Sequence, residues 1–211
     1  MITILSSKIV AEITTLIVLI LSAGLSVTIT MRYVKSRRTN LLFWSSGLWV
    51  FTAGVLLELA FAAGIYSALL GRVYLFLVAV LVELLALGSI QFARSITVKR
   101  AYYLFVLVST LFIAYSLAST NIGNIIVNYI VAGVIPITIV IASSLITFPA
   151  AIILVLFAYK SYRVTKNRRL LSIIAGVVVV SVAGGLYIVQ YPAFLYIAEL
   201  IGIAMLWYGF I

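Results

Sequence analysis

Long apolar runs separated by short polar or basic segments make up the pattern of this chain. At about 20 residues per membrane crossing, the pattern predicts a single bundle spanning residues 1–211, with no separate soluble domain. The predicted fold class is an all-α integral membrane protein, a bundle of seven transmembrane helices. The helices are predicted at residues 9–31, 41–65, 73–94, 101–119, 138–159, 170–190 and 193–211.

The pattern is ambiguous between residues 120 and 159. Residues 119–124 are polar and predict a loop, but the next 35 residues, 125–159, carry no charge. Two crossings there would move the following basic residues to the opposite side of the membrane, so one crossing is expected, with Pro149 inside it. The surplus, residues 125–136, is expected to form either a β-hairpin on the outer side or an extension of the helix.

Composition agrees with a membrane protein. Hydrophobic residues make up 66% of the 211 residues and charged residues only 9%, whereas soluble domains carry about 25% charged residues. This composition excludes a water-soluble fold. The expected location is the cell membrane, as a multi-pass protein.

Basic residues are distributed unevenly between the two sides of the predicted bundle. Of the fourteen, all except Lys8 and Arg72 fall at the turns that follow the first, third and fifth crossings. Short loops rich in Lys and Arg stay on the cytoplasmic side, so we expect the N-terminus outside and the C-terminus inside. Anionic inner-leaflet lipid is the expected counter-charge. The expected lipid contacts are Arg37, Arg38, Lys99, Arg100, Lys166, Arg168 and Arg169.

The residue types that most often carry catalysis or bind metals are missing. The chain has no Cys, no His and no Asp, which removes thiol nucleophiles, histidine acid–base pairs and the usual transition-metal ligands. No enzymatic activity, metal or cofactor is therefore expected. The net charge of +10 does not indicate a nucleic-acid partner, because no aromatic residues are interleaved with the basic ones on a separate face.

The chain has four acidic residues, all of them glutamates. Together they are the candidate site. Glu12 lies at the outer end of the first predicted helix, Glu58 and Glu199 in the outer parts of the second and seventh, and Glu83 near the middle of the third. An ionisable residue within a crossing is a hypothesis of function by default, here a proton or cation site. The alternative is that each carboxyl hydrogen-bonds a neighbouring helix. Glu83 is expected to face the interior and to find its partner in Glu199, Tyr196 or the second helix.

Two basic loops resemble each other in sequence. Residues 35–42 align with residues 160–171 when two gaps are allowed, and Gly47 and Gly176 follow at equal distances. This similarity indicates an internal repeat in which helices one to three correspond to helices five to seven, joined by the fourth. Such parallel repeats occur in transporters. The alternative is that apolar hairpins with basic loops look alike through compositional bias.

This 3+1+3 plan resembles the heptahelical arrangement shared by opsin-like, receptor-like and PQ-loop proteins. The second and third predicted helices are also similar to prokaryotic, archaeal-like seven-helix membrane proteins. The chain departs from the named classes in two ways: its seventh helix has no lysine for a retinal Schiff base, and it has no Pro-Gln pair. Neither function is implied by the resemblance.

Three functions are compatible with the sequence. The preferred one is a structural or accessory subunit of a larger membrane complex, in contact with other subunits or with copies of itself. The alternative is a small transporter that uses the outer glutamates as a proton or cation coupling site, and the third is a heptahelical sensor. A transporter should have a polar cavity at membrane mid-depth, whereas a subunit should have a filled core and an apolar lateral face.

Overall fold

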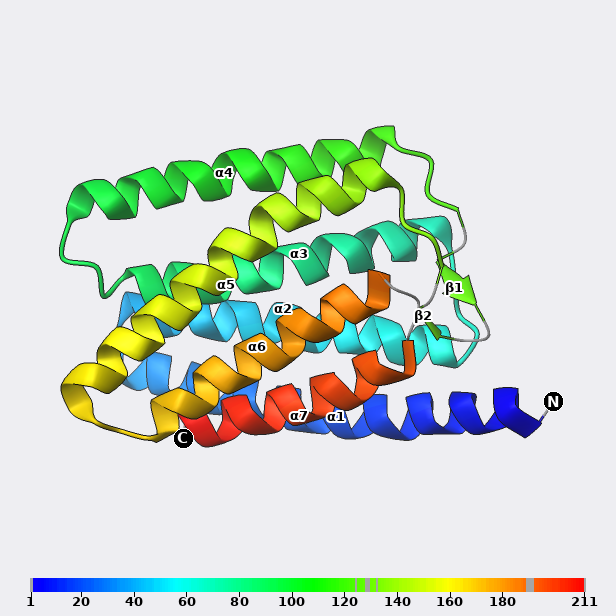
Figure 1. Ribbon diagram of the computed structural model, residues 1–211, viewed down its shortest axis with the longest axis horizontal. Coiled ribbons are helices and arrows are strands. Elements are labelled where there is room, and N and C mark those ends of the chain that lie inside the picture. The colour runs from blue at the N-terminus through cyan, green and yellow to red at the C-terminus, as the bar shows by residue number, and fades with distance from the viewer. Residues whose placement is uncertain (1, 124, 128–129, 132, 189–191, 211) are drawn as a thin grey trace.

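A computed structural model of the protein describes residues 2–123, 125–127, 130–131, 133–188 and 192–210. Apart from one short hairpin, the described chain is all-α, with seven helices (Figure 1). In chain order these are α1 (Ile2–Ser36), α2 (Thr39–Ala62), α3 (Ala68–Ile90), α4 (Ile96–Ser119), α5 (Ile137–Thr165), α6 (Arg169–Ile188) and α7 (Pro192–Phe210).

Five helices are long and apolar enough to cross a membrane. They are α2, α3, α4, α5 and the Glu12–Ser36 part of α1. The shortest of the five has 23 residues, roughly 35 Å at 1.5 Å per residue, which exceeds the roughly 30 Å of a bilayer's hydrocarbon core. Within their described side chains, α6 and α7 hold shorter apolar stretches, Arg169–Val179 and Tyr196–Phe210. These are the features of a multi-pass helical membrane protein.

Helix boundaries differ from the sequence prediction mainly at the polar ends. The third and fourth helices begin about five residues earlier than predicted, because Ser67 and Ser95 act as N-caps. Their side chains accept hydrogen bonds from the amides of Leu70 and Val98, as N-cap serines commonly do. The first and fifth helices also extend farther than predicted, to Ser36 and Thr165, because helical backbone can continue past the end of an apolar run.

The packing of the seven helices forms a closed ring in chain order. Each helix packs against the next one in the sequence, and α7 packs back against α1. α3 also packs against α5 across the ring. This additional contact leaves α4 at the periphery, where its helix neighbours are α3 and α5.

The segment before α5 forms a β-hairpin, which resolves the alternative left open by the sequence. Strand β1 (Ile126–Val127) pairs with β2 (Ile130–Val131) in antiparallel register, with Ile126 opposite Val131. Residues 128–129 and 132 of the expected segment lie outside the described residues. Ile125 and Val131 are buried against a core that includes Phe61 of α2. The hairpin therefore covers one end of the bundle, called the hairpin end below.

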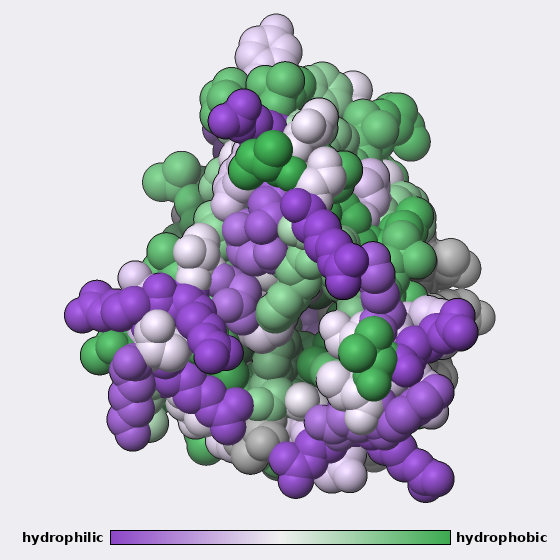
Figure 2. Space-filling model, turned by 90° about the vertical axis from the view of Figure 1, so that its left-hand side faces the viewer, coloured by the Kyte–Doolittle hydropathy of each residue, from purple (hydrophilic) through white to green (hydrophobic). Residues whose placement is uncertain are grey.

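The opposite end carries the basic turns and is called the basic end. The α1–α2, α3–α4 and α5–α6 connections all lie there, and Figure 2 shows hydrophilic side chains gathered over this face. Arg72 lies near the hairpin end, where its guanidinium contacts the carbonyl oxygen of Thr120. The side chain of Lys8 lies outside the described residues.

Close approach of α2 and α3 depends on Gly88. A Cβ atom added there would lie 2.9 Å from the carbonyl oxygen of Asn40 and closer still to the indole of Trp44. We expect Gly88→Ala to lower the free energy of unfolding by about 1–3 kcal/mol, the usual range for overpacking. The measurement is thermal or denaturant unfolding in detergent micelles.

Gly54→Ala on α2 is the matched control. An added Cβ at Gly54 meets nothing within 4 Å, and alanine favours a helix over glycine by about 1 kcal/mol. The control should therefore be as stable as the wild type or more stable. Equal stability of the two alanine variants would show that Gly88 does not set the α2–α3 distance.

Candidate functional site

Three of the four candidate glutamates are buried in the bundle, and they belong to two separate clusters. Glu58 and Glu199 lie together with Tyr74 and Tyr196, a group called the paired-carboxyl cluster below. Glu83 lies instead in an α3–α4 cluster. That cluster consists of Glu83, Tyr102, Ser109 and Thr110.

The paired-carboxyl cluster joins α2, α3 and α7. The exposed fractions of Glu58 and Glu199 are 2% and 7%. The Tyr74 hydroxyl donates a 2.6 Å hydrogen bond to Oε1 of Glu58. The Oε2 atom of Glu58 is buried and has no hydrogen bond of ordinary geometry among the described residues. The neighbouring group with which Glu58 interacts is the carboxyl of Glu199.

Helix periodicity and the hairpin place these side chains. Tyr196 and Glu199 are three residues apart on α7, so they share a face. The amide of Val131 in β2 donates a 3.3 Å hydrogen bond to the Tyr196 hydroxyl. The paired-carboxyl cluster therefore lies directly beneath the hairpin, toward the less basic end of the bundle.

Two adjacent carboxyl groups in an apolar interior have a restricted chemistry. Two neighbouring carboxylates repel each other strongly where the dielectric constant is low, whereas one proton between them converts the repulsion into a hydrogen bond. The pair can therefore hold and release a proton, or hold a small monovalent cation.

Glu83 faces the interior, as expected, with an exposed fraction of 1%. Its partners are on α4, because the Ser109 hydroxyl donates to Oε1 and the Thr110 hydroxyl donates to Oε2 at 2.8 Å. The prediction that its partner would be Glu199, Tyr196 or a residue of the second helix was wrong.

Glu83 meets α4 and not the paired-carboxyl cluster because of the angle between side chains on α3. Tyr74 and Glu83 are nine residues apart, about two and a half turns at 100° per residue, so they point to opposite faces of α3. One face reaches the paired-carboxyl cluster and the other reaches α4. Both carboxyl oxygens of Glu83 are hydrogen-bonded, as in a structural contact between helices.

Sequence reasoning missed four polar residues of these clusters. Tyr74, Ser109 and Thr110 supply the hydrogen bonds to the carboxyls. The Tyr102 hydroxyl is buried without a hydrogen-bond partner among the described residues, within electrostatic reach of Glu83. Three of them could have been found from the sequence. Ser109 and Thr110 form a polar pair in an apolar helix, two turns after Tyr102. Glu12, the fourth candidate, is partly buried on α1.

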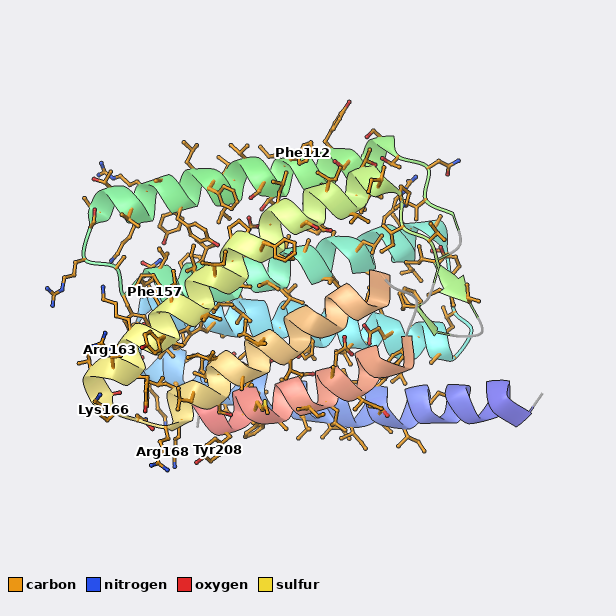
Figure 3. All side chains as sticks on the ribbon, in the orientation of Figure 1. Phe112, Phe157, Arg163, Lys166, Arg168 and Tyr208 are labelled. Carbon is orange, nitrogen blue, oxygen red and sulfur yellow. The ribbon has the colours of Figure 1, made fainter. Side chains whose placement is uncertain are left out.

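The residues expected to contact lipid all lie at the basic end. Six of the seven are exposed and Lys99 is partly buried. Two of these guanidinium groups lie over aromatic rings, Arg37 over Tyr33 and Arg169 over Tyr208, both 5.9 Å from the ring centre. Figure 3 shows Lys166 and Arg168 extending from this end, near Tyr208.

Two surface cavities involve α5. One, of about 680 Å³, lies toward the basic end and is lined by Leu156, Phe157, Tyr159, Lys160, Arg163 and Val164. The other, of about 250 Å³, lies between α4 and α5 toward the hairpin end. Its lining is Phe112, Tyr115, Ser116, Ser119, Thr120, Thr138 and Ile141. Neither of these cavities is lined by a glutamate.

Comparison of the chain with known protein families, curated proteins and solved structures gives no match. The geometry of the two clusters and of the bundle surface is therefore the basis for inferring what the protein does.

Proposed function

We propose that this chain is a non-catalytic, multi-pass protein of the cell membrane that serves as a structural or accessory subunit of a larger membrane complex. The observation that carries the proposal is the use of polar side chains within the bundle. Glu83 contributes both carboxyl oxygens to hydrogen bonds with α4, and the two α5 cavities do not reach a glutamate. Polar residues used in this way hold helices together.

The peripheral helix offers the lateral face that a subunit needs. α4 packs against α3 and α5, and its outer side exposes Leu104, Leu107 and Leu111 by 63%, 59% and 61%. Lipid covers such a face in a free bundle, and a partner helix covers it in a complex. We propose that a partner helix covers this face of α4.

Purification from native membranes tests this proposal. We expect a stoichiometric membrane partner, a different chain or a second copy, to remain bound to the wild type in mild detergent. Leu111→Trp on the outer side of α4 should remove it through a steric clash, as measured by mass spectrometry of the intact complex. Ile20→Trp on α1, which is 65% exposed in the wild type, is the matched control and should retain the partner.

A partner retained by both tryptophan variants would place the interface elsewhere. A monomer without any bound chain would contradict the subunit proposal itself.

A second candidate function is favoured by the paired-carboxyl cluster. Glu58 comes from the first group of three helices and Glu199 from the last, so the pair lies where the two groups meet. Substrate and coupling-ion sites of transporters built from repeats lie at such junctions. We propose proton-coupled transport through this pair as the alternative.

We further propose that α1–α3 and α5–α7 are the two copies of an internal repeat. The turns after α1 and α5 support it. Arg37 and Lys166 both adopt a left-handed backbone conformation, with φ of 54° and 55°. The amide of each donates a 2.7 Å hydrogen bond to the carbonyl of the tyrosine four residues earlier, Tyr33 or Tyr162.

Helix contacts in the two halves support the same alignment. Gly47 and Gly176 lie ten residues after Arg37 and Lys166, so this alignment needs none of the gaps of the sequence alignment. A Cβ added at Gly47 would meet Leu85, and one added at Gly176 would meet Leu206. Failure of the two helix triplets to superpose about an axis near the membrane normal in an experimental structure would remove the repeat.

The proposed topology has seven crossings, with the N-terminus outside and the C-terminus inside. It rests on the clustering of basic residues at one end of the bundle. A reporter fused after Ile211 should therefore be cytoplasmic, and one inserted at residues 121–124 should be external. Activity of paired phosphatase and fluorescent-protein fusions measures both positions, and the reverse result at either one would contradict the topology.

The transport alternative predicts different outcomes for two glutamates. In vesicles with an imposed pH gradient, Glu58→Gln should abolish proton flux, because an amide cannot exchange the proton. Glu83→Gln is the matched control. It should leave flux unchanged and alter the free energy of unfolding by about 1 kcal/mol, the size of an interhelical hydrogen bond.

Equal flux in the wild type and in Glu58→Gln would rule out this pair as a coupling site. Circular dichroism of both variants shows whether each is folded.

A further inference from the structure

The α5 groove of about 680 Å³, near the basic end, has the polarity of a lipid site. Its six lining residues run from Leu156 to Val164. At about 100° per residue, they form one contiguous face of α5 that is about two turns long. Figure 3 shows Phe157 and Arg163 on this part of α5, with Arg163 nearer the end of the bundle.

Polarity changes along the groove. Leu156 and Phe157 form an apolar part on the side toward the middle of the bundle, and Val164 is an apolar residue at the other end. Lys160 lies one turn after Leu156 and Arg163 one turn beyond it. Residues three apart are neighbours on a helix surface, so the ammonium and guanidinium groups can approach one ligand together.

The described residues provide no carboxylate for these two cations. Helix α5 contains no acidic residue. Glu58, Glu83 and Glu199 are buried in the bundle, and Glu12 lies on α1, which is not a neighbour of α5 in the ring. Both Lys160 and Arg163 are exposed, and among the described residues neither is within salt-bridge distance of an acid. Both cations are therefore accessible to an external anion.

We infer that this groove binds the headgroup of an anionic phospholipid. The phosphate would lie between Lys160 and Arg163, and an acyl chain would lie along Leu156 and Phe157. Arginine recognises phosphate with a planar fork of donors, and lysine does so as a point charge. A soluble phosphate shares the headgroup chemistry but does not contact the apolar part of the groove. The inference does not depend on whether the protein is a subunit or a transporter.

Native mass spectrometry of the purified full chain tests the site. The protein is titrated in detergent micelles with phosphatidylglycerol and, separately, with phosphatidylcholine. We expect preferential retention of phosphatidylglycerol by the wild type and loss of most of it in the Lys160→Gln, Arg163→Gln double variant. The Lys35→Gln, Arg94→Gln double variant also removes two exposed charges at the basic end but leaves the groove intact, and it should retain the lipid.

Three outcomes overturn the inference. Equal retention of the two lipids by the wild type would show that no anionic headgroup is recognised. Equal loss in both double variants would show a diffuse effect of charge. Displacement of phosphatidylglycerol by millimolar inorganic phosphate would show that the headgroup alone binds. If the Lys160, Arg163 variant does not fold, Phe157→Ala replaces it, and undiminished lipid binding in that variant contradicts the acyl-chain contact.

Discussion

Hydrogen bonding between helices is the constraint on which this bundle depends, because hydrocarbon offers no partner to a polar side chain. Tryptophan indoles meet part of this need. Trp44 donates to the carbonyl oxygen of Leu85 on α3 at 3.1 Å, and Trp207 donates to that of Leu21 on α1 at 2.7 Å. These bonds join α2 to α3 and α7 to α1, so they help to close the ring. The carboxyl clusters are further cases of the same rule, in which a costly group is accommodated by a neighbouring helix.

How much of this was predictable depends on the range of the interaction. The number of helices and the basic end follow from apolar run length and from charge, which are local properties of the sequence. The partner of Glu83 depends on which face of α3 meets which helix, a property of the whole ring. The hairpin was undecided for a similar reason. A segment rich in Ile and Val suits a strand or a helix, and burial of Val131 under the neighbouring core selects the strand.

The two carboxyl clusters show that similar residues can have different roles in one bundle. Glu83 has a hydroxyl donor on each oxygen, so it is a saturated contact. Glu58 has a tyrosine donor on one oxygen and a second carboxyl beside it, so one of its two partners is itself a titratable group. From the sequence, Glu58, Glu83 and Glu199 were candidates of the same kind, because each lies within a predicted crossing. Their contacts distinguish them.

The left-handed residues Arg37 and Lys166 have a consequence for the balance between stability and orientation. Glycine adopts this backbone conformation without strain, whereas other L-residues lose roughly 1–2 kcal/mol there. Folding stability alone would therefore favour glycine at both turns. Each turn instead carries a positive charge, of the kind that determines how a helix inserts into the membrane. Under the proposed topology, these two positions would exchange native-state stability for a charge that acts earlier, while the helices are being inserted.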